Sequence, residues 1–487
     1  YVRAINATSL EGGQLWTTDL RLGVAQPFGG RQSRGIARAR GPIFINPFAE
    51  AGKEQEGVMR TVGRVLGGGE VTQPLGSELV LDNTSWQRAR SIVSAINSRF
   101  PEGPGDNGPT ARGRTGASIE LRVPNRFRTE PAAFLDLVRH IRISATAPEE
   151  TARRFAEGLK SEPALATELS WCLEAVGTKA LPFLRDLYEY PEVFPRLAAL
   201  KAGARLNDPL AATPLIKLAR TGQASVRTDA ITLLGRLDAG PSVDLALREF
   251  LAEDDLTVRI AAYEALAGRA ERVQLARLSA RAAQLRERNL PSPTPTHLQV
   301  IAEQALPGGT IQGVERTPVG GKFLFDRVRV GPPLIYITQQ GQPRIVLFGE
   351  GDMVRTPMVV SGFGDRLMMV ADDPGAVRGL YRGPTTDRAM TLTIKPDLEE
   401  MIRVFAHDTT PEDPRPGLGM SYSEVVGTLY SMQQASATRT EFATERERLL
   451  ADLQAANQSL EVAERPERPE DRDLVLILTQ VQDAIEL

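Results

Sequence analysis

The chain has 487 residues, 41% hydrophobic and 24% charged, which is the composition of an ordinary globular protein with several domains. Its 58 basic and 61 acidic residues give a formal net charge of −3, which excludes a general electrostatic attraction to nucleic acid. No apolar run approaches the ~20 residues that a transmembrane helix needs, and the single cysteine, Cys172, excludes an intramolecular disulfide.

Residues 1–147 are predicted to form an α+β domain. Polar and apolar residues alternate between residues 117 and 124, which places Ile119, Leu121 and Val123 on one face of a strand. From residue 86 to residue 100, apolar side chains recur at helical spacing and form one stripe.

Five signatures follow one another in residues 8–143. Ser9 to Leu20 has the pattern Ser-Leu-x-Gly-Gly-x-Leu-x-x-Thr-x-Leu, three glycines end a strand at Gly69, and Ala95 to Pro101 reads Ala-Ile-Asn-Ser-Arg-Phe-Pro. A strand at 117–124 and a helix at 131–143 complete the order. This arrangement resembles the flagellar basal-body P-ring protein family, and a weaker resemblance covers residues 344–455.

The resemblance implies a structural subunit of a closed ring rather than an enzyme. It implies that the partner is the chain itself, with peptidoglycan and other envelope proteins as possible further partners. It also implies export to the periplasm or to the outer-membrane side of the cell envelope. The chain begins at Tyr1 rather than methionine, so a signal peptide is expected to be absent from this sequence.

Residues 148–306 are predicted to be HEAT-like helical repeats. Arg196, Arg227 and Arg259 stand in register at spacings of 31 and 32 residues, each followed by alanine three positions later. Repeats of this kind bury their apolar faces against their neighbours, so the array forms one continuous core. We interpret the Arg-x-x-Ala pattern as a packing and helix-terminus device. Because the P-ring family lacks such repeats, the ring need not belong to a flagellum.

The remaining residues are predicted to form three further parts. Residues 307–400 read as a β-rich domain, either a compact sandwich or a barrel, because short apolar runs alternate with Gly and Pro. Residues 401–457 read as an amphipathic helical segment, and residues 458–487 as an extended tail with a terminal strand. The terminal strand either pairs with a neighbouring subunit or packs onto its own domain. The candidate assembly contacts on these last two segments are Phe442, Leu449, Leu453, Leu474, Leu476 and Leu478.

A cluster of positive charge stands near the N-terminus. Arg31, Arg34, Arg38 and Arg40 fall within ten residues with no acidic residue between them. A solvated loop is one reading. The other is a contact with a neighbouring subunit or with the cell wall, because guanidinium groups bind carboxylates bidentately.

No pattern of residues indicates catalysis, a metal or a cofactor. The three histidines, His140, His297 and His407, lie far apart, and none has a second metal ligand at a suitable spacing. The nucleophile-elbow and phosphate-loop motifs do not occur. We therefore expect a structural protein. The alternative is a monomeric envelope adaptor that uses its helical solenoid to bind another protein or peptidoglycan.

Overall fold

The computed structural model describes residues 1–10, 12–21, 35–46, 61–72, 76–103, 106, 108–127, 130–143, 147–238, 240–288, 290–291, 293, 301, 313–350, 354–362, 366–383 and 389–445. The fold is multidomain α+β, as predicted. Contacts divide the chain into two compact units, one made of residues 1–74 with 248–454 and the other of 75–247 with 455–487. The predicted domain boundaries at residues 147 and 306 stay predictions.

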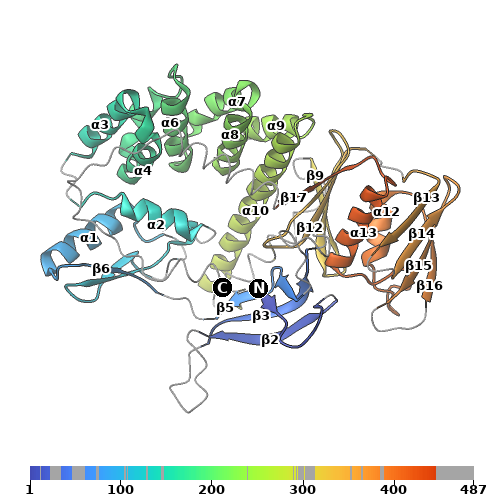
Figure 1. The fold of residues 1–487 in the computed structure, drawn as a ribbon. Helices are drawn as coiled ribbons and strands as arrows, with labels where there is room; N and C mark the ends of the chain where they lie inside the picture. The colour runs from blue at the N-terminus through green and yellow to red at the C-terminus, as the bar shows by residue number, and fades with distance from the viewer. Residues whose placement is uncertain are drawn as a thin grey trace, which may run out of the picture. The chain divides into compact units, whose positions relative to one another are not determined.

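A small antiparallel sheet and two helices begin the second unit (Figure 1). Ile119 and Leu121 point into its apolar core, which confirms the predicted strand, whereas Trp86 lies on the exposed side of its helix. The sheet has the order β6-β8-β7. The elements are β6 (Ser77–Val80), α1 (Trp86–Arg99), β7 (Ala111–Gly113), β8 (Ser118–Leu121), η1 (Asn125–Phe127) and α2 (Pro131–Arg139).

The family-like pattern at the end of α1 has a clear structural role. The Asn97 side chain both donates to the Ala111 carbonyl, at 2.9 Å, and accepts from the Ala111 N–H, at 2.8 Å. Arg99 donates to the backbone carbonyls of Glu174 and Ala175, which end a later helix. These two side chains therefore fasten α1 to the sheet on one side and to the helical region on the other.

A stacked array of helices follows in the second unit. Arg196 and Arg227 both occupy the fourth position of their helices, and the Arg227 Nε donates to the Ala219 carbonyl at 2.7 Å. The predicted helix-terminus contact is thereby confirmed for Arg227. The elements are α3 (Pro148–Ser161), η2 (Pro163–Leu165), α4 (Ala166–Val176), η3 (Thr178–Ala180), α5 (Leu181–Arg185), α6 (Val193–Arg205), η4 (Pro209–Ala211), α7 (Ala212–Thr221), α8 (Ala224–Arg236) and α9 (Pro241–Phe250).

The other unit contains a long helix, α10 (Leu256–Glu287), and two sheets. The first sheet has the order β17-β11-β12-β10-β9, in which β10 pairs with β12 and β11 with β17 in parallel. Its strands are β9 (Val314–Val319), β10 (Phe323–Val328), β11 (Leu334–Ile337), β12 (Arg344–Phe348) and β17 (Glu441–Thr444).

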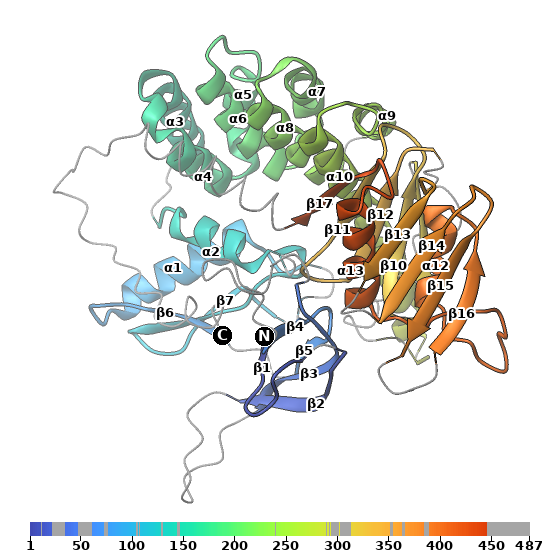
Figure 2. The same ribbon diagram turned by 45° about the vertical axis from the view of Figure 1, so that its right-hand side comes forward.

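The second sheet is an antiparallel meander, visible in Figure 2. Its strands are β13 (Met358–Gly362), β14 (Leu367–Ala371), β15 (Val377–Arg382) and β16 (Ala389–Ile394). Helices α12 (Leu398–Ala406) and α13 (Tyr422–Gln434) share one apolar core with both sheets. The β-rich character predicted for this region is confirmed, with the helices as part of the same core.

The helix predicted to run past Phe442 ends earlier. Helix α13 ends at Gln434, and Ser436 adopts a positive φ of 52° just beyond it. Phe442 lies in strand β17 opposite Ile335, half-buried, with its ring 5.8 Å from that of Tyr430. Pairing with β11 decides its conformation, so the helical assignment is corrected. Leu449, Leu453, Leu474, Leu476 and Leu478 lie outside the described residues.

The tight packing of the helical array leads to a stability prediction. Ala230 in α8 is 0% exposed, so Ala230→Gln forces an amide into a filled space and should lower the free energy of unfolding by about 1–3 kcal/mol. Thr232→Gln, at an exposed position of the same helix, is the matched control. Urea unfolding followed by circular dichroism compares the two, and equal midpoints would contradict a packed array.

Candidate assembly surface

An N-terminal sheet projects from the first unit, and most of its side chains are exposed. Its order is β1-β4-β3-β2, and β5 pairs with β3 beside β2. The strands are β1 (Val2–Arg3), β2 (Gln14–Arg21), β3 (Gly35–Phe44), β4 (Val62–Val65) and β5 (Gly69–Val71). We call strands β2, β3 and β5 together the N-terminal ribbon.

One face of the N-terminal ribbon is apolar and uncovered. Leu20, Ala37 and Val71 lie directly opposite one another across the three strands, so their side chains share a face. Leu20 is 47% exposed and Val71 is 68% exposed. Trp16 is 83% exposed, but it lies at the irregularity of the pairing between Leu15 and Thr18, so the register does not assign it to this face. Apolar side chains gathered in this way usually mark a contact surface.

The opposite face of the ribbon is charged. Arg38 lies opposite Asp19 on β2 and Glu70 on β5, and its Nε donates to the Asp19 carboxylate at 2.9 Å. Arg40 is two residues further along β3 and is exposed, so it shares this face. The structure thus brings two of the four predicted arginines together. Arg31 and Arg34 lie outside the described residues.

Strand β2 is also an edge of its sheet. Within the described part of the chain it pairs with β3 alone, which leaves the backbone N–H and C=O groups on its other side without a strand partner. Such an edge, eight residues long here, can accept a strand from another chain.

Two glycines allow the ribbon to fold on itself. Gly67 adopts a φ of +62° in the turn between β4 and β5, as expected for the Gly67 to Gly69 run. A Cβ on Gly68 would lie 2.1 Å from the Arg40 carbonyl oxygen, so no larger residue fits where the turn crosses β3. Backbone geometry therefore explains Gly67 and Gly68, whereas a Cβ on Gly69 would meet nothing within 4 Å.

The base of the ribbon is fixed to the rest of its unit. Phe44, at the end of β3, belongs to the large apolar core. The Gln339 side chain donates to Asn46 at 3.2 Å, and Arg64 donates to the Gln339 carbonyl at 3.4 Å. Glu445 accepts from the Gln339 N–H at 2.7 Å. The ribbon thus projects from a base with polar and apolar anchors.

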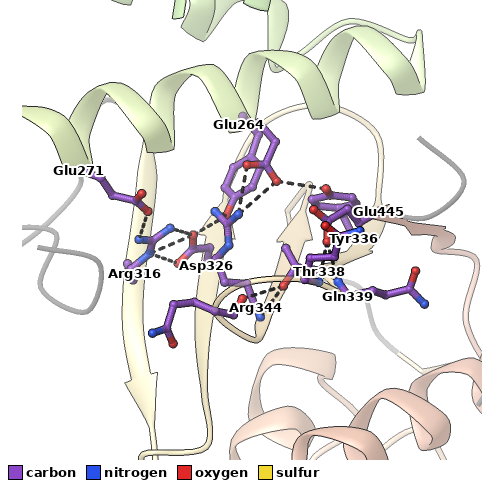
Figure 3. A network of polar contacts seen from close by, with 12 residues as sticks. Glu264, Glu271, Arg316, Asp326, Tyr336, Thr338, Gln339, Arg344 and Glu445 are labelled. Atoms are coloured by element: carbon purple, nitrogen blue, oxygen red, sulfur yellow. Dashed lines mark hydrogen bonds and ion pairs between the residues drawn. The ribbon is translucent and has the colours of Figure 1, made fainter. Parts of the chain in front are cut away.

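A buried polar network lies behind this base and joins α10 to the first sheet (Figure 3). Asp326 on β10 accepts from Arg316 at 2.7 Å and from the Tyr263 hydroxyl at 2.6 Å. Arg316 also donates to Glu271 on α10 at 2.8 Å. The side chains of Arg316 and Asp326 are both 0% exposed.

The buried guanidinium groups of the network stay charged because each has a carboxylate partner. Burial by itself lowers the pKa of Arg316, but the hydrogen bonds and charge of Asp326 raise it above its ordinary value. Burial likewise opposes the charge on Arg344, yet Glu264 at 3.1 Å raises the pKa of that guanidinium. Burial raises the pKa of the Tyr263 phenol, which therefore stays protonated and donates.

This network holds α10 against the first sheet and does not present a side chain for a chemical reaction. The acids near Arg316 and Arg344 are held by guanidinium or phenol donors, so none is free to act as a base. Among the described residues, no group of three or more His, Cys, Asp or Glu side chains could hold a metal ion. No helix in the described part of the chain is long and apolar enough to span a membrane.

The sequence did not single out the apolar face of the ribbon. The signal was present in the strand itself, where Trp16 and Leu20 stand among polar residues of β2. Their exposure could not be predicted, because it depends on which side of the sheet the rest of the unit covers.

Comparison with known proteins finds a family model that matches the first third of the chain. Residues 2–153 match the family model described as flagellar P-ring protein. That family is structural and not catalytic. A search of curated proteins finds no match. The match ends at residue 153, so the weaker resemblance over 344–455 stays a prediction.

One matching solved structure is the complex of CpcE and CpcF of phycocyanin lyase from Nostoc sp. PCC7120. It is 20% identical, and the alignment covers 32% of this chain and 98% of that chain with a TM-score of 0.23. A TM-score of this size supports no statement about shared function.

The buried network leads to a second stability prediction. Asp326→Asn removes the buried carboxylate that accepts from Arg316 and Tyr263, leaves Glu271 as the remaining charged partner of Arg316, and should lower the free energy of unfolding by about 3 kcal/mol. Asp372→Asn removes the partner of Arg378 on the surface and should cost about 0–1 kcal/mol.

Guanidinium chloride unfolding of the full chain compares these two variants. Replacing both members of the buried pair, with Arg316→Met and Asp326→Leu, should be less damaging than Asp326→Asn alone, because the charge that then loses its partner is Glu271, which is partly exposed to solvent. If Asp326→Asn costs no more than Asp372→Asn, the buried pair does not hold α10 on the sheet.

Proposed function

We propose that the chain is a structural subunit of a P-ring-derived homo-oligomeric ring in the bacterial cell envelope, which need not be flagellar. Two findings support the proposal. The family model for the flagellar P-ring protein matches residues 2–153, and these residues include the whole N-terminal ribbon. The ribbon exposes an apolar face that a stable monomer would cover.

The exposed apolar face carries the proposal, because it is a physical reason for association. Covering a Leu or Val side chain contributes about 2 kcal/mol, and the row of Leu20, Ala37 and Val71 can be covered only by another molecule or another segment. In a closed ring with more than two subunits, this surface meets a different surface of the next copy. The open edge of β2 beside it adds backbone donors and acceptors to such a contact.

The P-ring family is periplasmic, and we place this chain in the periplasm or on the outer-membrane side of the envelope. Peptidoglycan and other envelope proteins are then within reach as further partners. Arg38 and Arg40, on the charged face of the ribbon, are the candidate contacts with acidic groups of a neighbouring subunit or of the wall polymer.

The alternative is a monomeric envelope adaptor that binds another protein or peptidoglycan through its helical array. The two functions differ in particle mass and shape. Negative-stain imaging and sedimentation of the full chain separate them, because only the proposed function predicts a closed particle of many copies. A chain that sediments as a monomer over a wide concentration range would contradict the proposed ring.

The ribbon surface can be tested with a matched pair of variants. Leu20→Ser with Val71→Ser should weaken each subunit contact by about 3–4 kcal/mol, or more than a hundredfold, because two apolar side chains are lost. Val359→Ser with Met368→Ser removes equally exposed side chains from the second sheet and is the control. Sedimentation velocity gives the oligomer fraction. If both pairs weaken assembly alike, the ribbon is not the contact.

The arginine cluster makes a separate prediction about salt. Changing Arg31, Arg34, Arg38 and Arg40 to Gln should loosen assembly or wall retention at low ionic strength and have little effect at high ionic strength. Screening is the reason, because the Debye length falls from about 30 Å at 0.01 M to about 3 Å at 1 M salt. Equal retention of the variant and the parent at low salt would leave a solvated charged segment as the better reading.

A further inference from the structure

A cleft lies within the second unit, between α1 and the first helices of the array. Its volume is about 580 Å³, within the range of small-molecule sites. Helix α1 forms one wall, the segment after α2 another, and the start of α3 and the end of α4 complete it. None of the residues that line the cleft belongs to the N-terminal ribbon.

The wall formed by α1 is made of hydroxyls and guanidinium groups. Ser91, Ser94 and Ser98 follow one another at helical spacing, and Arg90 and Arg99 flank them. The helix contains no acidic residue. Across the cleft, Arg142 adds a third guanidinium, and no Asp or Glu is among the lining residues.

The positive charges of the lining are poorly matched by the protein itself. Arg90 and Arg142 form no ion pair with any described residue. Arg99 donates to the backbone carbonyls of Glu174 and Ala175 rather than to a carboxylate. Burial, followed by the charge of Arg126, lowers the pKa of Arg99 to about 10, so it is still protonated at neutral pH.

Nearby carboxylates are already engaged elsewhere. Glu174 on α4 pairs with Arg205 at 3.3 Å, and a carboxylate oxygen of Glu168 lies 2.8 Å from the His140 Nε2. His140 is therefore held at the cleft wall by α4 and by the Asp136 carbonyl. None of these acids neutralises Arg90 or Arg142.

The other cavity of comparable size has different chemistry. It measures about 590 Å³ and lies beside α12 in the first unit. Its lining combines three carboxylates, of Asp397, Glu399 and Glu400, with the guanidinium groups of Arg403 and Arg415, so acidic groups outnumber guanidinium groups. The lining of the α1 cleft thus has an excess of guanidinium groups that this cavity lacks.

We propose that the α1 cleft binds a small ligand with several oxyanion groups, either carboxylates or phosphates. Planar guanidinium groups bind such groups through paired hydrogen bonds, and the hydroxyls of Ser94 and Ser98 supply further donors, whereas the Ser91 hydroxyl donates to the Gln87 carbonyl. Arg90 and Arg142 are the residues that contact the ligand from opposite walls. Arg99 contributes a positive charge and also holds the C-terminal end of α4, because its side chain donates to the carbonyls of Glu174 and Ala175.

The test measures binding of citrate and of inorganic phosphate to the full chain by isothermal titration calorimetry at low ionic strength. Arg90→Gln with Arg142→Gln should weaken binding at least about tenfold, because two charge-assisted contacts are lost. Arg88→Gln with Arg112→Gln removes the same charge from exposed positions outside the cleft and is the matched control. Its affinity should equal that of the parent.

The two probes also separate the possible sources of the oxyanion. Tighter binding of citrate assigns the cleft to carboxylate ligands, and tighter binding of phosphate assigns it to phosphate ligands; either result supports the proposal. Equal weakening by the two double variants would mean that general surface charge attracts the anions, which overturns it. A parent chain that binds neither probe overturns it as well. Unchanged circular dichroism of both variants confirms that they fold.

Discussion

The buried contact between Arg316, Asp326 and Tyr263 is the constraint on which the first unit depends. A guanidinium and a carboxylate without solvent exposure are tolerated only if every donor and acceptor is matched. The match requires α10 to present Tyr263 and Glu271 at one position along β9 and β10. If α10 slid along the sheet or rotated, at least one buried charge would lose its partner. The network therefore specifies a single placement of α10 on the first sheet.

Further hydrogen bonds link this network to the N-terminal sheet. Arg344 connects the network to Thr338, whose hydroxyl accepts from the Arg344 N–H at 2.9 Å, and the adjoining turn holds Asn46 and Arg64 through Gln339. Tyr422, on α13, donates to the Thr338 carbonyl at 2.6 Å from the opposite side. The ribbon therefore stands on a base held from several elements, which suits the proposed role of a surface that contacts another molecule in a fixed orientation.

The second unit shows how helical repeats can be joined to P-ring-like elements. Ala175 of α4 belongs to the same apolar core as Ile119 and Phe134, and Trp171 packs against it. Arg236 on α8 pairs with Glu130, just before α2, at 2.8 Å. The small sheet and the helical array thus share one apolar core and are joined by an ion pair. This agrees with a family match that continues past the sheet into α3, as far as residue 153.

Local patterns in the sequence were enough to predict the elements whose neighbours are close in the chain. The repeat of Arg196 and Arg227, the strand containing Ile119 and the turn at Gly67 all follow from periodicity or backbone preference, and the structure confirms them. The P-ring-like order of residues 8–143 was visible for the same reason. Such signals depend on a few consecutive side chains and so survive without knowledge of the fold.

Only the tertiary structure decided the rest. Phe442 lies in a strand because β11, far earlier in the chain, offers a partner, and Trp86 is exposed because the core covers the other side of α1. The uncovered face of the ribbon and the basic cleft beside α1 also arise from distant segments that meet. The physical reason is that burial and strand pairing depend on contacts between segments that are far apart in the chain. Such contacts are determined by the whole sequence, but they cannot be read from a local pattern of residues.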